Sequence, residues 1–175
     1  MARESDGDSR LAAGLSMALQ AATDAQRQIV RAATDLRQAI GVRDAVRLAA
    51  AVDGERAALA VAAEADATLR SAVGDLTVAL GLPATTALPA VVSLLARRGH
   101  RRQAACLAAA RQTLAEEMER ARQANAGNAV LLRQAIALTT LALRHLTAGG
   151  GDAQAYTPAG LASGAGPYRV LDARA

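Results

Sequence analysis

The sequence predicts an all-α fold, an elongated antiparallel hairpin or bundle of long, coiled-coil-like helices with a flexible C-terminal tail. Apolar residues make up 52% of the 175 residues but aromatic residues only 1%, and the chain has no Phe and no Trp. Alanine and leucine supply the apolar content instead. Both are strong helix formers, and small side chains let neighbouring helices approach closely. No segment alternates apolar and polar residues as a half-buried strand would.

The first long helix is predicted from about residue 9, where Asp8 or Ser9 is placed to cap it. Apolar positions then repeat every seven residues, which predicts two rows along one face of a helix that packs against others. One row is Leu15, Ala22, Ile29 and Leu36, and the other is Leu11, Ala18, Ala25, Ala32 and Ala39. Gly41 weakens the helix near its end.

Residues 42–59 predict a short helical piece, a soft break at Asp53-Gly54, and then a second long helix. The stretch Gly-Leu-Pro at 81–83 ends that helix, because glycine suits a left-handed C-cap and proline cannot continue the hydrogen-bond ladder.

A short helix follows to about Arg98, capped by Thr85 or Thr86 and with Pro89 in its first turn. The basic stretch RRGHRR at 97–102 is interpreted as a solvated turn, since no aromatic residue interleaves it.

A last long helix is predicted from about Arg101 to Thr147, and the Gly run at 149–151 ends it. The sequence therefore divides into a helical domain, 1–148, and a flexible tail, 149–175, which is rich in Gly, Ala and Pro and has no apolar period.

The last helix carries more apolar surface than one neighbour can cover. At about 100° per residue, one seam of apolar residues runs along its length and is expected to pack on the earlier helices. That seam contains Leu107, Leu114, Met118, Ala121, Asn125, Asn128, Leu132, Ile136, Thr139, Leu143 and Leu146. A second flank holds Leu131, Leu138, Leu141 and Ala142. The apolar arc spans roughly 220°, whereas packing on one neighbour needs roughly 100°.

Two interpretations of this second flank stay open. It is a partner site, as large exposed apolar patches usually are, or two sister helices cover both faces of the last helix. Arg133, Thr140 and Arg144 form the narrow polar strip beside it. Asn125 and Asn128 lie on the seam, where a buried amide either satisfies backbone groups of another helix or bonds the backbone of a bound peptide.

No catalytic constellation is found, so no enzyme, cofactor or metal site is predicted. His100 and His145 lie far apart, and no Glu-x-x-His spacing exists. Cys106 is interpreted as a small core residue, and Glu116, Glu117 and Glu119 as a solvated face.

The polar start of the chain is no signal peptide and the single cysteine fits a reducing compartment, so a cytoplasmic location is expected. The net charge of +4 is too mixed to indicate nucleic-acid binding, and the apolar run 135–143 is too short for stable membrane insertion.

The order of these segments resembles the FlgN-type flagellar export chaperones. The resemblance covers most of the chain: a long first helix, an RDAVRLAA-like piece, a second long helix that closes on a LGLP-type end, and a long last helix. Its most telling stretch is the Asn-x-x-Asn pair before a Leu-Leu helix, here NAGNAVLLRQAIAL, and residues 156–160 are similar to the family's Tyr-Gly-x-x-Gly tail. The expected aromatic residue in the last helix is absent, and Arg43-Asp44 matches the family's short acidic step only loosely.

The resemblance implies a cytoplasmic type III export chaperone without enzymatic activity. Such a protein binds the hook–filament junction (hook-associated) proteins, keeps them unpolymerised until export, and delivers them to the export gate. The expected partner-binding residues are Leu131, Leu138, Leu141, Ala142, Asn125, Asn128, Arg133 and Arg144, with Tyr156 as a contact made by the tail. The alternative functions are a structural coiled-coil homodimer without a client and, more weakly, a nucleic-acid binder that uses RRGHRR.

Overall fold

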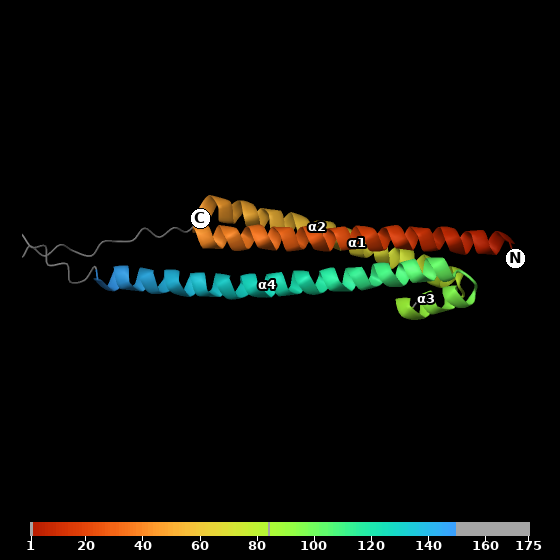
Figure 1. Ribbon diagram of the computed structural model, residues 1–175. Coiled ribbons are helices and arrows are strands. Elements are labelled where there is room, and N and C mark those ends of the chain that lie inside the picture. Colours follow the sequence, from red (N-terminus) through yellow and green to blue (C-terminus); the bar gives the residue numbers. More distant parts are fainter. Residues whose placement is uncertain (1, 84, 150–175) are drawn as a thin grey trace, which may run out of the picture. The chain divides into compact units, whose positions relative to one another are not determined.

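The computed structural model describes residues 2–83 and 85–149, and the side chains of residues 7–83 and 85–147. Every regular element in these residues is a helix: α1 (Ala2–Val42), α2 (Ala45–Ala79), α3 (Leu88–Arg97) and α4 (Arg101–Gly149) (Figure 1). The all-α prediction is confirmed. The predicted tail lies outside the described residues except for Gly149, which is the last residue of α4.

The chain divides into two compact units, Met1–Val130 and Leu131–Ala175. The first unit contains α1, α2, α3 and α4 as far as Val130, whereas the second contains the end of α4. The boundary therefore falls inside a continuous helix.

Helices α1 and α2 form an antiparallel hairpin with a two-residue turn (Figure 1). Arg43 has a φ of 59°, in the left-handed region that side chains other than glycine rarely adopt. Asp44 then caps α2, because its Oδ1 accepts hydrogen bonds from the backbone nitrogens of Val46 at 2.9 Å and Arg47 at 3.2 Å. The Arg43-Asp44 step thus has a clear structural role as turn and cap.

The seven-residue pattern of α1 is confirmed as its buried face. The row Leu15, Ala22, Ile29 and Leu36 is buried throughout, and in the second row Ala18, Ala25 and Ala39 are buried. Alanines on this face allow close helix packing, which compensates for the shortage of bulky side chains.

The predicted start of α1 is wrong. Asp8 and Ser9 lie inside the helix, which already begins at Ala2. Asp8 is buried and pairs with Arg98, whose Nη1 lies 3.4 Å from its Oδ2. The second nitrogen of Arg98, Nη2, donates to the carbonyl of Leu80 at 3.1 Å. One arginine thus links α1, the end of α2 and the end of α3.

The predicted break at Asp53-Gly54 is also wrong, because α2 is continuous through both residues. A glycine inside a helix costs only about 1 kcal/mol, and the alanine-rich segments on either side favour the helix strongly enough to offset that cost. Asp53 contributes by pairing with Arg56 one turn later, at 3.4 Å. A Cβ at Gly54 would meet nothing within 4 Å, so packing does not require the glycine.

Two glycine caps end α2 and α3. Gly81 has a φ of 70° and Gly99 a φ of 97°. At the end of α2 the backbone nitrogen of Leu82 donates to the carbonyl of Thr77 at 3.0 Å, and at the end of α3 the nitrogen of His100 donates to the carbonyl of Leu95 at 3.1 Å. Both are Schellman motifs, so the predicted end of the second long helix is confirmed.

The start of α3 differs from the prediction. Ala87 occupies the N-cap position and makes no side-chain hydrogen bond, so neither Thr85 nor Thr86 caps the helix. Pro89 lies in the first turn as expected, where its missing N–H is tolerated and its fixed φ favours the helix.

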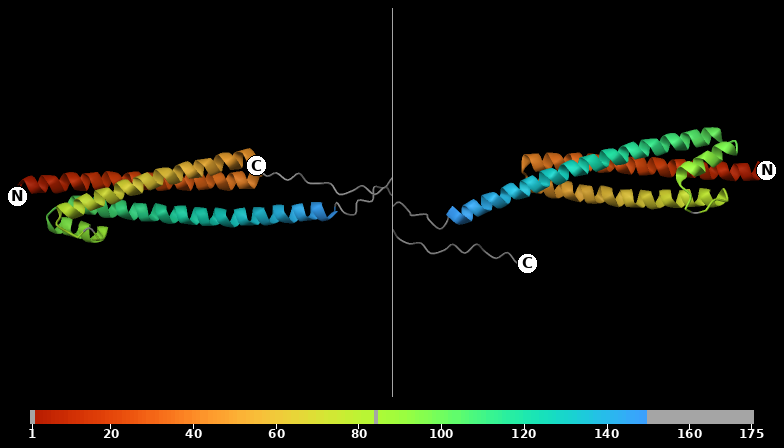
Figure 2. Two further views of the ribbon diagram at one scale, coloured as in Figure 1. Left: turned by 180° about the vertical axis from the view of Figure 1, so that it is seen from behind. Right: turned by 90° about the horizontal axis from the view of Figure 1, so that it is seen from below.

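The main core of the first unit contains buried residues from all four helices. The four helices come together near the start of α4 (Figure 2). The largest side chains in this core are fully buried. They are Leu15 and Leu19 from α1, Leu76 from α2, Val91 and Leu95 from α3, and Leu107 from α4. Farther along the bundle a thinner cluster joins Ile29, Ala58 and Ala121 from three helices.

Candidate functional site

The part of α4 that belongs to the first unit buries one row of residues every seven positions. Leu107, Leu114, Ala121 and Asn128 are all buried. Met118, which the apolar pattern placed on the seam, is 36% exposed, and the neighbouring Glu117 is buried instead. Hydrophobicity alone predicts that Met118 is the buried residue. Glu117 is buried instead because Arg27 on α1 supplies a charged partner for its carboxylate.

Glu117 bridges α1 and α4. Its Oε1 accepts a hydrogen bond from Nε of Arg27 on α1 at 3.3 Å and from Nη1 of Arg120 at 3.0 Å. The hydrogen bonds to Glu117 and then Asp24 raise the pKa of Arg27. The predicted solvated face is therefore wrong for Glu117, while Glu116 and Glu119 are exposed as expected.

The two seam asparagines have different surroundings. Asn128 is 3% exposed, and its Nδ2 donates to the backbone carbonyl of Ala33 on α1 at 2.6 Å. This carbonyl has a second lone pair, so it can accept the amide as well as its own helical hydrogen bond. In contrast, the buried Oδ1 of Asn125 has no hydrogen-bond partner among the described residues. The structure thus favours the structural interpretation for Asn128.

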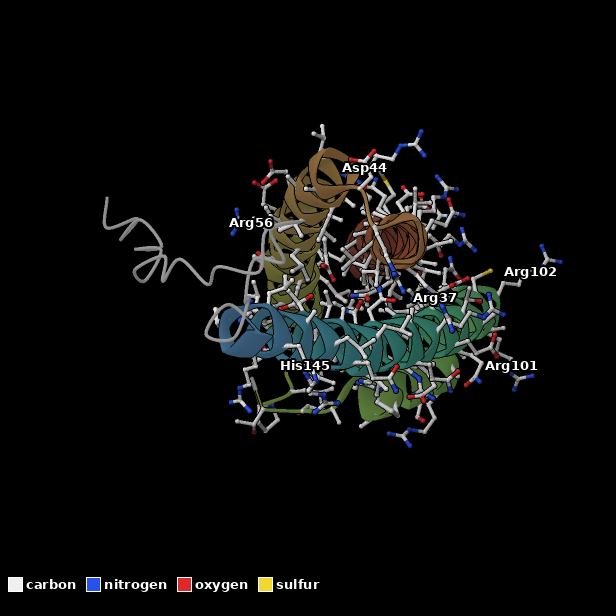
Figure 3. The ribbon with its side chains drawn as sticks, turned by 90° about the vertical axis from the view of Figure 1, so that its left-hand side faces the viewer. Arg37, Asp44, Arg56, Arg101, Arg102 and His145 are labelled. Carbon is white, nitrogen blue, oxygen red and sulfur yellow. The ribbon has the colours of Figure 1, made fainter. Side chains whose placement is uncertain are left out.

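The basic turn between α3 and α4 is open to solvent. Arg97, Arg101 and Arg102 are exposed, and Figure 3 shows Arg101 and Arg102 pointing away from the helices. Arg98 is held by Asp8 and Leu80 as described above. Cys106, expected in the core, is exposed on α4. Within the part of the chain that the structure describes, no three His, Cys, Asp or Glu side chains lie together as metal ligands would.

The end of α4, in the second unit, exposes large apolar side chains around most of its circumference. Leu131 and Leu132 are half-buried, and Ala142, Arg133 and Arg144 are exposed. Five larger side chains are between half and three-quarters exposed: Ile136 at 65%, Leu138 at 61%, Leu141 at 52%, Leu143 at 57% and Leu146 at 74%. The exposure of Leu138 and Leu141 agrees with the predicted second flank.

The expectation that the whole seam is covered is wrong for Ile136, Leu143 and Leu146, which are all exposed.

The charged side chains at the end of α4 are all basic. Between Arg120 and Gly149 the sequence has no Asp or Glu, and its charged side chains are arginines, with His145 near the end of α4 (Figure 3). By length and composition, α4 from Arg101 to Thr147 is also the one helix in the described residues that is able to cross a membrane. A helix whose apolar faces are covered by a partner protein has the same composition, so this property alone does not assign the surface.

Long helices with an alanine-rich core define the chain as an all-α protein of the coiled-coil-like class, and its last helix ends in a broadly apolar segment. The model of the FlgN protein family matches residues 11–164, which include the Asn pair and the whole apolar end of α4, and the chain belongs to this family. The family consists of flagellar export chaperones, which bind flagellar proteins and are not enzymes. No curated protein and no solved structure matches the chain.

Proposed function

We propose that the chain is a cytoplasmic type III export chaperone whose clients are the hook–filament junction proteins. It binds them through the end of α4, prevents their polymerisation before export, and delivers them to the export gate. The main support for the proposal is that five large apolar side chains are exposed between Ile136 and Leu146 at the end of α4. Apolar surface of this extent on a soluble protein usually marks a binding site.

The chemistry of the segment suits an amphipathic client helix. Leu138 and Leu141 offer an apolar face, and covering one leucine side chain contributes about 1.5–3 kcal/mol. Arg133 and Arg144 lie beside that face and favour carboxylates at the edge of the client helix. Asn125, Leu131 and Ala142 stay in the proposed set as neighbours on the same helix. Asn128 was expected in that set too, but it is buried against Ala33 and supports the register of α4 instead. The contact by Tyr156 lies outside the described residues.

Binding of purified junction protein to the full chain tests the proposal. Wild-type protein is expected to form a stable complex of defined stoichiometry in size-exclusion chromatography and calorimetry. Leu138→Glu is expected to abolish it while helicity and the unfolding temperature stay unchanged, because the leucine is 61% exposed. Met17→Gln is the matched control, since Met17 on α1 is 70% exposed and lies outside the proposed surface.

Two results would contradict the proposal. If wild-type protein and junction protein elute separately at micromolar concentration, the client assignment is wrong. If the chain alone is a dimer by light scattering and Leu138→Glu makes it a monomer, the apolar surface serves self-association, and the structural homodimer replaces the chaperone.

A further inference from the structure

The end of α4 carries two apolar faces, and they lie on opposite sides of the helix. At about 100° per residue, Leu138 and Leu141 are centred roughly 180° from Ile136 and Leu143. We call Leu138 and Leu141 the first face, and Ile136, Leu143 and Leu146 the second face. All five side chains are more than half exposed. Each face by itself resembles the apolar stripe of an amphipathic helix.

One docked helix cannot cover both faces. Helix packing uses a stripe roughly 100° wide, so a single client helix on the first face leaves the second face in water. Three large apolar side chains would then stay exposed in the complex. We propose that the client presents two helices, which enclose the end of α4 between them as the middle helix of a three-helix assembly. This inference rests on the proposed function and specifies its partner.

The first and second faces are separated by two narrower strips of the helix surface, one on each side. The two strips differ in composition, and this difference indicates how the client helices are arranged. Ala135 and Ala142 lie on one side, next to Leu146 of the second face, and these two small side chains let the client helices approach each other there. Arg133 and Arg144 lie on the other side, eleven residues or about three turns apart. The client helices therefore meet over the alanines, and their Asp or Glu residues line the open edge next to the arginines.

Charge also argues against a second copy of this chain as the occupant. The segment from Arg120 to Gly149 has no carboxylate, so two copies paired through it would bring arginines together without counter-charges. A client with acidic residues beside its apolar stripes supplies those charges. The occupant is therefore a different protein with two acidic, amphipathic helices.

Two matched double variants of the full chain test the inference. Leu138→Gln with Leu141→Gln removes the first face, and Ile136→Gln with Leu143→Gln removes the second. All four side chains are more than half exposed, so both variants are expected to keep the helicity and unfolding temperature of the wild type. Each is expected to weaken junction-protein binding by about tenfold or more in calorimetry, with a one-to-one complex for the wild type.

Removal of either of the two proposed client helices from the junction protein sharpens the test. The truncated client is expected to bind more weakly and to become insensitive to the substitutions on one face, because that face no longer has a partner. If only one double variant weakens binding of the intact client, the client uses one helix and the two-helix inference is wrong, although the proposed function stands. A complex with two client molecules per chain contradicts the inference in the same way.

Other occupants give distinct results. If the free chain is a dimer that both double variants convert to monomers, a second copy occupies the faces, contrary to the inference. If the chain does not bind junction protein but co-sediments with phosphatidylglycerol vesicles, and both variants lose that binding, the faces contact lipid. The proposed function and this inference then fail together.

Discussion

Asn128 on α4 donates a hydrogen bond from Nδ2 to the backbone carbonyl of Ala33 on α1, over 2.6 Å. It is a buried side-chain contact between residues 95 positions apart in the sequence. Because a buried amide must find a partner, this hydrogen bond favours one register of α4 against α1 over neighbouring ones. The two asparagines of the Asn-x-x-Asn pair therefore have separate consequences for stability.

Replacement of the two asparagines is expected to have different effects on stability. Asn128→Ala removes the donor to Ala33 and should lower the free energy of unfolding by about 1–2 kcal/mol. Asn125→Ala removes a buried oxygen that has no partner among the described residues and should leave stability equal or higher. Urea unfolding followed by circular dichroism measures both. Equal losses for the two variants would contradict a register role for Asn128.

Glu117 is expected to contribute more to stability than its exposed neighbour Glu119. Glu117→Gln removes the charge between Arg27 and Arg120 at a side chain that is only 8% exposed, and should cost about 1–2 kcal/mol. Glu119→Gln alters an exposed pair with Arg122 and should change stability by less than about 0.5 kcal/mol. Thermal unfolding of both variants at the same ionic strength separates the two cases, and indistinguishable values would show that the bridge is not a stabilising contact.

Arg98 is expected to hold the start of α1 to the ends of α2 and α3. Arg98→Ala loses the contacts with Asp8 and with the Leu80 carbonyl, and should lower stability by about 1 kcal/mol. Backbone amides near Asp8 should then exchange hydrogen faster. Arg97→Ala is the control, since Arg97 is exposed and is the preceding residue in the chain. Unchanged exchange near Asp8 in the Arg98 variant would contradict the link.

Glycine substitutions are expected to have opposite effects in a helix and at its cap. Gly54→Ala should stabilise the protein by about 0.5–1 kcal/mol, because Gly54 is helical and exposed and a Cβ there meets nothing within 4 Å. Gly81→Ala should destabilise it by about 1 kcal/mol, because a φ of 70° disfavours any side chain. Guanidinium unfolding midpoints check both signs, and a loss of stability in Gly54→Ala would mean that α2 does bend there in solution.

Local chemistry made several features readable from the sequence alone. The seven-residue pattern of Leu15, Ala22, Ile29 and Leu36 predicts the buried face of α1 because burial follows the helical period. Gly81 and Pro83 mark the end of α2 because backbone conformation at those positions is intrinsic to the residues. The family resemblance, now confirmed over residues 11–164, depends on the order of such local signals.

Other features depend on residues far apart in the chain, and the pattern of single helices could not show them. Glu117 is buried instead of Met118 because Arg27, 90 positions away, supplies its counter-charge. Asn128 finds its hydrogen-bond partner in Ala33, and Asp8 finds its ion-pair partner in Arg98. Both contacts join different helices, so the apolar pattern of a single helix does not predict them. α2 continues through Gly54 because a single unfavourable residue is outweighed by the helix on either side of it.

The sequence by itself determined the helical content, the buried face of α1, the glycine-capped end of α2 and the family, since each follows from local propensity and period. Only the tertiary structure decided where the seam of α4 stops being covered. Burial depends on which other side chains a residue meets, and the period of one helix does not contain that information. Residues of the same seam are therefore buried at Leu107 and exposed at Leu143.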